Sequence, residues 1–270
     1  MNLENIFSKI EKTDPEIYQR LDTRRQVMHR FTNLGGKFIL TAIPFALGSM
    51  LNKAYGQTPT NIVDILNFAL KLEYLESEFY SIAINTGGFI KDPDVASFNL
   101  IAQHEAAHVA FLTNTITSLG GSAIAKPEFD FTADGQYHTF TNYQTFLQLS
   151  QAFEDTGVRA YKGQVQGLIS NNDVLTAALQ IHSVEARHAA HVRMIRRANE
   201  ASPNEKPWIT ANNSNGVNSE QAAYNGEENV MQISVDISKL PGATNLSATE
   251  AFDEPLTVDE VLAIIDPFIV

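Results

Sequence analysis

The chain has 270 residues, 44% of them hydrophobic, which is enough for one sizeable core with appendages. Its 19 basic and 31 acidic residues give a net charge of −12, so no nucleic-acid partner is expected. The absence of cysteine excludes thiolate metal sites, cysteine nucleophiles and disulfides.

Residues 1–56 are predicted to be an export signal. No acidic residue occurs from Thr23 to Val63, and paired arginines begin the stretch "TRRQVMH". The apolar segment "FILTAIPFALGSML" is shorter than the roughly 20 residues of a membrane-spanning helix, and "AYG" supplies small residues for cleavage. The pattern resembles a twin-arginine signal, which predicts a periplasmic protein that meets a membrane only during export. The alternatives are an amphipathic helix packed on the domain or the membrane surface, and a cytoplasmic protein.

Four long helices are predicted in residues 57–200, at about 60–84, 93–120, 142–169 and 174–198, with Asp92 as the N-cap of the second. Short links make the first and last pairs antiparallel hairpins. About 20 residues between the second and third helices are rich in turn formers and long enough to travel the length of a roughly 35 Å helix. The expected fold is all-α: a four-helix bundle with one long crossover between helices 2 and 3, plus a small C-terminal extension.

The core-facing stripe of each predicted helix carries acids or histidines where apolar residues belong. On the second helix, for example, Glu105 and His108 continue the 3-4 spacing of Phe98, Ile101 and Leu112. A bare carboxylate in a bundle core costs several kcal/mol, so such a set needs a shared partner. The stripe positions concerned are Glu73 and Glu76, Glu105 and His108, Glu154, and Glu185 and His188.

The two helix pairs also look like a repeat. Glu73, Tyr80, Glu105 and His108 are matched about 80 positions later by Glu154, Tyr161, Glu185 and His188. A single Glu-x-x-His is common by chance, whereas the doubled pattern with both lone acids is not.

The residue types indicate a pair of metal ions. Four Glu and two neutral His carry a charge of −4, which two divalent ions neutralise. Carboxylate and imidazole ligands suit iron or manganese, with zinc as an alternative. Glu105 and Glu185 are expected to bridge the ions; His108 with Glu73, and His188 with Glu154, would complete one ion each. The competing interpretation is a metal-free core with hydrogen-bonded acids.

The series "E…Y", "EAAH", "E…Y", "EARH" resembles the ferritin-like di-metal carboxylate superfamily. Within it, "PEFDF", "EARHAAHVR" and "AFDEPLTVDEVLAII" are similar to desiccation-related ferritin-like domain proteins, over residues 60–270. The resemblance implies the same six ligands: Glu73, Glu105, His108, Glu154, Glu185 and His188.

The other stripe residues have more than one interpretation. Glu76 is matched by Gly157 in the repeat, and we predict it as the catalytic proton carrier; the alternatives are an extra ligand or a partly solvated acid. Tyr80 and Tyr161 are either hydrogen-bond partners of ligand carboxylates or ordinary core aromatics. His104 falls off the ligand positions, which indicates a surface or helix-flank histidine.

Residues 201–270 are expected to wrap the bundle and to provide a subunit contact in a homo-oligomer. "QISVDIS" alternates as a short strand does, and Thr257 and Glu260 have the spacing of a capping box before a terminal helix. Two functions are consistent with the whole sequence: a redox enzyme acting on peroxide or O2, and a non-catalytic metal-binding protein for desiccation or stress protection.

Overall fold

The computed structural model describes residues 61–199, 206–213 and 218–270. The predicted export signal lies outside these residues. Among the helices that are described, none combines the length and the apolarity needed to cross a membrane.

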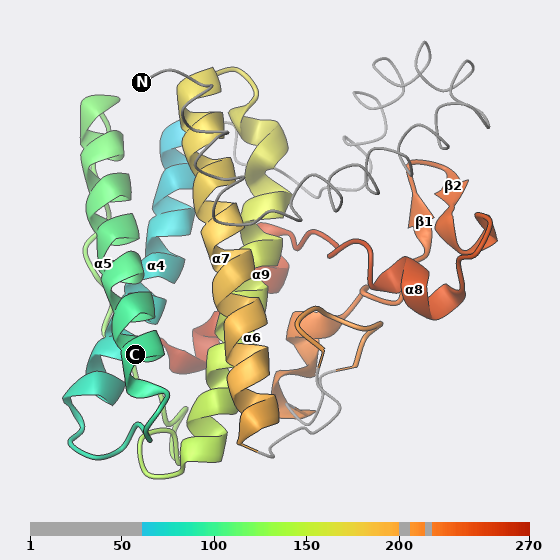
Figure 1. The fold of residues 1–270 in the computed structure, drawn as a ribbon. Coiled ribbons are helices and arrows are strands. Elements are labelled where there is room, and N and C mark those ends of the chain that lie inside the picture. Colours follow the sequence, from blue (N-terminus) through green and yellow to red (C-terminus); the bar gives the residue numbers. More distant parts are fainter. Residues whose placement is uncertain (1–60, 200–205, 214–217) are drawn as a thin grey trace, which may run out of the picture. The chain divides into compact units, whose positions relative to one another are not determined.

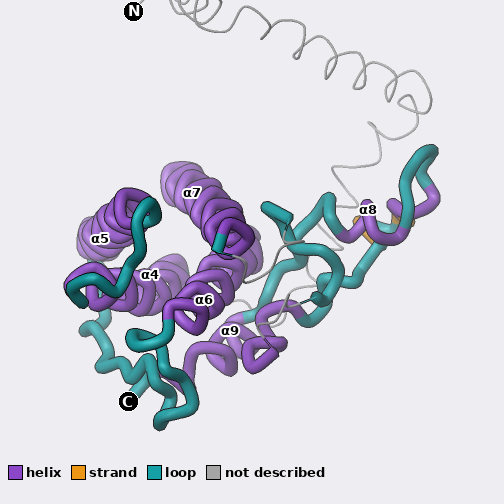
Figure 2. The backbone as a smooth tube through the Cα atoms, turned by 60° about the horizontal axis from the view of Figure 1, so that its bottom comes forward, coloured by secondary structure: helices purple, strands orange, loops and turns teal. Residues whose placement is uncertain are grey.

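Four long helices run alongside one another and form a bundle (Figure 1). They are α4 (Ile62–Asn85), α5 (Val95–Ser118), α6 (Tyr143–Gln164, continued by the 3-10 turn η1, Val165–Leu168) and α7 (Asn172–Ala198). The pairs α4 with α5 and α6 with α7 make the most extensive contacts. Figure 2 shows the four helices in a view closer to the direction of the bundle axis. The predicted all-α bundle with one long crossover after its second helix is therefore confirmed.

Side-chain caps determine where three of these helices begin. Asn61, Asn142 and Asn171 each accept a hydrogen bond from a backbone N–H in the first turn of α4, α6 and α7. The expected start of the second helix was wrong, because α5 begins at Val95 with Asp94 rather than Asp92 as its N-cap.

Asp94 stands at the N-cap position of α5, but its backbone is in the right-handed helical region and its carboxylate makes no capping hydrogen bond. Other groups bind that carboxylate instead. Tyr143 Oη donates to Asp94 Oδ2 over 2.7 Å, and Asn199 Nδ2 donates to the same oxygen over 2.9 Å. Asp94 thus ties the start of α5 to the start of α6 and the end of α7.

The predicted strand at "QISVDIS" was also wrong. The segment forms a very short antiparallel pair, β1 (Met231–Gln232) and β2 (Val235–Asp236), followed by the 3-10 turn η3 (Ile237–Lys239). Ile233 and Ser234 adopt left-handed backbone angles, so the chain turns back on itself. The physical reason is exposure: the side chains of 231, 233 and 235 are each nearly half exposed, and no core faces them.

The remaining elements of the C-terminal part are short helices. They are η2 (Asn218–Tyr224), α8 (Asn245–Thr249), α9 (Val258–Ile265) and η4 (Asp266–Phe268). The capping box predicted for α9 is confirmed: the Thr257 side chain accepts from the Glu260 backbone N–H, and the Glu260 side chain accepts from that of Thr257.

A buried arginine joins the C-terminal part to α6. Arg159 is 1% exposed and donates to the carbonyl oxygens of Ala223, Asn225 and Glu254. Its Nε also lies 2.7 Å from Glu227 Oε1. One α6 side chain therefore satisfies three backbone carbonyls and a buried acid that lie 64 or more residues further along the chain.

The chain's last residues hold the crossover. Asp130 donates its backbone N–H to the Phe268 carbonyl, and Val270 donates to that of Glu128, each over 3.0 Å. Between these two bonds, Phe129 and Ile269 form an antiparallel bridge.

The hydrophobic core is divided into two clusters along the bundle. One is rich in aromatic residues, with Phe79 packed on Phe131, Phe146 and Phe153 at ring distances of 5.0–5.3 Å. The other contains aliphatic residues near the beginning of α4 and α7. The predicted ligand residues lie between the two clusters, so apolar layers separate them from both ends of the bundle.

Candidate metal centre

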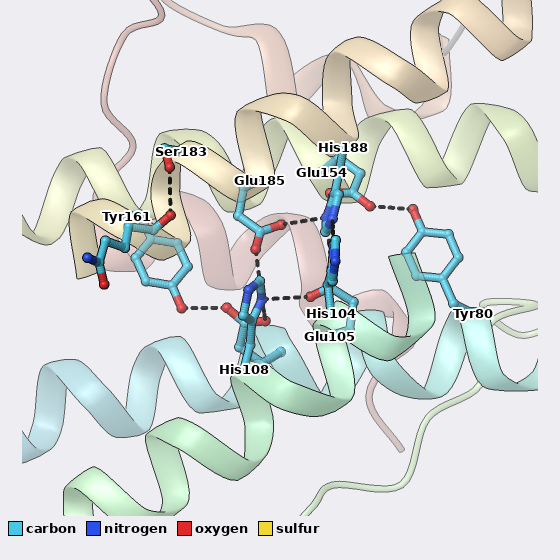
Figure 3. Close-up of polar contacts among 11 residues, drawn as sticks. Tyr80, His104, Glu105, His108, Glu154, Tyr161, Ser183, Glu185 and His188 are labelled. Carbon is cyan, nitrogen blue, oxygen red and sulfur yellow. Dashed lines mark hydrogen bonds and ion pairs between the residues drawn. The ribbon is translucent and has the colours of Figure 1, made fainter. Parts of the chain in front are cut away.

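All four long helices direct acids or histidines into the layer between the two hydrophobic clusters. Figure 3 shows Glu105, His108, Glu154, Glu185 and His188 pointing toward one another. Glu73 comes from α4, Glu105 and His108 from α5, Glu154 from α6, and Glu185 and His188 from α7. The four carboxylates are 0% exposed, and the two histidines are 9% and 5% exposed. The 3-4 spacing of the sequence thus places these six side chains on the inner faces.

The first group of side chains surrounds His108. Its Nδ1 lies 3.0 Å from Glu185 Oε1, 3.1 Å from Glu73 Oε2 and 3.2 Å from Glu105 Oε2. One potential ligand atom from each of these four residues lies within 4.8 Å of the others, which is close enough for them to share an ion.

The second group surrounds His188 in the same way. Its Nδ1 lies 2.8 Å from Glu105 Oε1, 3.4 Å from Glu154 Oε2 and 3.6 Å from Glu185 Oε2. These four residues also satisfy the 4.8 Å limit. Glu105 and Glu185 belong to both groups, which are the two positions at which the sequence predicted bridging carboxylates.

Strong electrostatic coupling follows from burying these groups together. Burial would raise the pKa of Glu185, but the close contacts with the His108 and His188 imidazoles outweigh it and lower that pKa to about 2. Burial and the charge of Glu185 raise the pKa of Glu105. Burial raises the pKa of Glu154 to about 7 although His188 opposes the shift.

The histidines respond in the opposite direction. Burial would lower the pKa of His108, but the neighbouring carboxylates of Glu105, Glu185 and Glu73 raise it to about 12. The pKa of His188 is likewise raised, because Glu154 and Glu105 outweigh the effect of burial. Protons on both rings therefore partly neutralise the acids, which is the role that a bound cation would take over.

The residues fit a metal, because several of their buried atoms lack hydrogen-bond partners within the described part of the chain. These atoms are Glu105 Oε1, Glu154 Oε2, both carboxylate oxygens of Glu185, and His188 Nδ1. They lie close to one another, yet without the alignment of a hydrogen bond. Such atoms are costly in a core unless a cation binds them.

The two tyrosines that the sequence related by the repeat contact the lone acids. Tyr80 Oη donates to Glu154 Oε1 over 2.5 Å, and Tyr161 Oη donates to Glu73 Oε1. Burial, followed by the charge of the accepting glutamate, raises the pKa of each phenol, so both remain donors. The ordinary-core interpretation of Tyr80 and Tyr161 is therefore replaced by a hydrogen-bonding one.

Glu76 is buried beside the same layer but belongs to neither ligand group. The position that matches it in the repeat, Gly157, gives it space: a Cβ atom built there would lie 3.2 Å from Glu76 Oε1. Burial, followed by the charge of Glu185 and the other three acids, raises the pKa of Glu76 well above its usual range. The partly solvated alternative is wrong, because Glu76 is only 2% exposed.

The sequence interpretation missed one neighbour of the centre. His104 was assigned to the surface or helix flank, but its Nδ1 lies 2.9 Å from His188 Nε2 and the two rings stack at 5.2 Å. His191, one turn beyond His188, pairs with Ser97 Oγ instead. The position of His104 next to Glu105 was the only available signal, and stripe spacing alone does not reveal a contact between helices.

The protein is therefore a helical bundle whose buried carboxylates and histidines, contributed by all four helices, are compatible with metal binding. A family model described as a ferritin-like domain matches residues 61–198, just over half of the chain. The chain belongs to this ferritin-like domain family. No curated protein matches the chain in a sequence comparison.

Proposed function

We propose that the protein binds a pair of iron or manganese ions and uses them to react with peroxide or O2. One observation carries this proposal: two groups of four buried ligand residues share Glu105 and Glu185. Shared carboxylates suit two ions held close together. The absence of sulfur ligands and the excess of carboxylate favour iron or manganese, with zinc as the alternative.

The bound pair would supply redox cycling between the divalent and trivalent states. The chain's own residues would control access and protons. The apolar layers above and below the ligands limit water, and Tyr80 and Tyr161 hold the lone carboxylates in place. Glu76 would carry a proton to or from the bound oxidant, since it is a buried acid that neither ligand group uses.

The alternative is metal binding without turnover, as expected for a desiccation- or stress-protective protein. It uses the same six ligands, so only an assay separates the two. Protein purified with its native metal, or reloaded with iron or manganese, should evolve O2 from peroxide or consume O2. If the fully loaded chain reacts with neither oxidant, the protective function replaces the enzymatic one.

Metal stoichiometry tests the site itself. Wild type should bind about two ions per chain, and Glu105→Ala combined with Glu185→Ala should remove both, because these residues belong to both groups. Asp64→Ala combined with Glu128→Ala is the matched control, since it removes two exposed acids. Full metal content in the Glu105→Ala, Glu185→Ala chain would place the site elsewhere.

For location, we propose export by the twin-arginine route, which moves folded proteins and so allows metal loading beforehand. Replacing Arg24 and Arg25 with Lys should keep the precursor in the cytoplasm, whereas Arg20→Lys with Arg30→Lys should not. A mature native protein that still begins at Met1 would contradict cleavage of the signal.

A further inference from the structure

A contact between two histidines joins α5 to α7 beside the second ligand group. His188 Nδ1 faces the acids of that group, 2.8 Å from Glu105 Oε1, whereas its other ring nitrogen, Nε2, lies 2.9 Å from His104 Nδ1. The two ring planes differ by only 13°, and the 5.2 Å between the ring centres exceeds the distance between the nitrogens by about two ring radii. The two nitrogens therefore lie on the line between the rings, where an N–H group of one points at the lone pair of the other.

The chemistry of imidazole assigns the donor in this hydrogen bond. His188 Nδ1 is one of the buried atoms without a hydrogen-bond partner in the described part of the chain, and it is the nitrogen that would bind a cation together with the acids. A neutral histidine that gives its Nδ1 lone pair to a cation keeps its proton on Nε2. His188 Nε2 is therefore the donor, and His104 Nδ1 is the acceptor.

The first ligand group lacks this arrangement. His108 has the same place in that group as His188 has in the second, and its Nδ1 also faces the acids. Among the residues that the structure describes, none forms a hydrogen bond with His108 Nε2. The position that matches His104 in the repeat is Val184, whose side chain has no acceptor. The two halves of the bundle thus differ at the residue that supports the histidine.

His104 has little part in the hydrophobic core. It lies in the wall of a pocket of about 500 Å³ between α5 and α7, which His188 and His191 also line. Its side chain is only partly buried. A substitution of His104 should therefore act through its bond to His188 rather than through packing.

We propose that His104 is a positioning residue that makes the two ion sites unequal. By accepting from His188 Nε2, it holds the ring in the orientation and the tautomer that leave Nδ1 free to bind a cation. Loss of such a partner typically lowers metal affinity by about 10- to 100-fold, so the second group should bind its ion more tightly than the first group does. This proposal rests on the pair of ions in the proposed function.

Titration of the full chain with Mn²⁺, in competition with a chelator, tests the proposal. Wild type should bind two ions with unequal affinity, and His104→Leu should weaken the tighter ion by about tenfold while leaving the other unchanged. His104→Asn should restore most of the loss, because its amide oxygen can accept in place of Nδ1. His191→Leu is the matched control, since it removes a histidine from the same pocket that pairs with Ser97 instead, and it should change neither affinity.

Two backgrounds with a single intact ligand group assign the loss to one ion. Glu73→Gln leaves the second group intact, and Glu154→Gln leaves the first group intact. Adding His104→Leu should cost about tenfold in affinity in the Glu73→Gln chain and nothing in the Glu154→Gln chain. Equal losses in both backgrounds, or no loss in either, would overturn the proposal.

Nuclear magnetic resonance tests the hydrogen bond itself without any assay of activity. In ¹⁵N-labelled protein loaded with Zn²⁺, the proton of the His188 ring should be on Nε2, and that nitrogen should show a scalar coupling to His104 Nδ1. His104→Leu should remove the coupling and His191→Leu should keep it. A His188 proton on Nδ1, or no coupling in wild type, overturns the proposal. If wild type nevertheless binds two ions, the proposed function stands; if wild type binds no metal, both are overturned.

Discussion

Tyr80 on α4 donates a hydrogen bond to Glu154 on α6, with 2.5 Å between Oη and Oε1. The repeat-related pair runs the opposite way, from Tyr161 on α6 to Glu73 on α4. Each half of the bundle thus supplies the tyrosine that orients the lone acid of the other half. This exchange explains why the sequence repeats Glu and Tyr seven residues apart on both helices.

Removing either hydroxyl should weaken metal binding. Tyr80→Phe and Tyr161→Phe should each lower metal affinity by about 10- to 100-fold, since the carboxylate then loses the donor that fixes its position. Competition with a chelator measures the affinity. Tyr143→Phe is the matched control, because this tyrosine also donates to a buried carboxylate. That carboxylate belongs to Asp94, which lies just before the start of α5 and is not one of the ligand residues. Equal losses in all three variants would show a general stability effect instead.

Glu76 and Glu73 should separate turnover from binding. Glu76→Gln should keep both ions but slow the reaction with peroxide or O2 by a factor on the order of 10². Glu73→Gln should instead weaken metal binding, because Glu73 belongs to the first ligand group. Metal counts and turnover assays on both loaded variants decide the roles. Loss of metal in Glu76→Gln with retention in Glu73→Gln would mean that the two roles are reversed.

Metal affinity should rise with pH. In the metal-free fold the pKa values of Glu154 and His108 are about 7 and about 12, so binding must displace protons. Glu185, with a pKa of about 2, has none to release. Affinity should increase at least about tenfold from pH 6 to pH 8, and calorimetry in buffers of different ionisation enthalpy should detect released protons. An affinity independent of pH would refute this coupling.

The stability of the metal-free chain should change in the opposite direction. The folded pKa of Glu154 lies above its unfolded value near 4.5, so its contribution is present below about pH 4.5 and is lost as the pH rises through about 7. Urea unfolding of metal-free protein should therefore show lower stability at pH 8 than at pH 5. Metal loading should reverse this trend.

Gly163 should not tolerate a side chain. Alanine normally stabilises a helix relative to glycine by about 1 kcal/mol. At Gly163, however, a Cβ atom would overlap the Leu256 carbonyl oxygen. We expect Gly163→Ala to lower the free energy of unfolding by about 2 kcal/mol, measured in urea, because α6 and the C-terminal part must separate. Gly87→Ala, at a position with open space around it, is the control and should have little effect.

Helical periodicity made the bundle and its inward-facing acids predictable, because stripe position depends only on spacing along one helix. Contacts between different helices were harder to predict from the sequence. His104 lies outside the stripe of α5, yet it meets His188 on α7 because the two helices flank the same layer. Arg159 could not be recognised as buried, since three of its partners are backbone carbonyls that carry no sequence signal, and its acid partner, Glu227, lies far along the chain.

Helix starts depended on similar tertiary effects. Proline at the first helical position predicted a start at Pro93, but Asp94 is held by Tyr143 and Asn199, and α5 begins after it. The alternation of apolar and polar residues in "QISVDIS" likewise predicted a strand. Alternation puts the apolar side chains on one face of the segment, but a strand is stabilised only where that face packs against a core.

The pairing between the crossover and residues 268–270 has a practical consequence for protein engineering. Phe268 is fully buried whereas Val270 is 81% exposed, so the backbone reaches the surface within two residues. A peptide tag or fluorescent fusion attached after Val270 should leave the fold intact. Deleting residues 268–270 should instead leave the space now filled by the Phe268 side chain empty, and should remove the backbone hydrogen bonds that hold Glu128 and Asp130. Truncated variants should therefore retain residues 268–270, and labels should be attached after Val270.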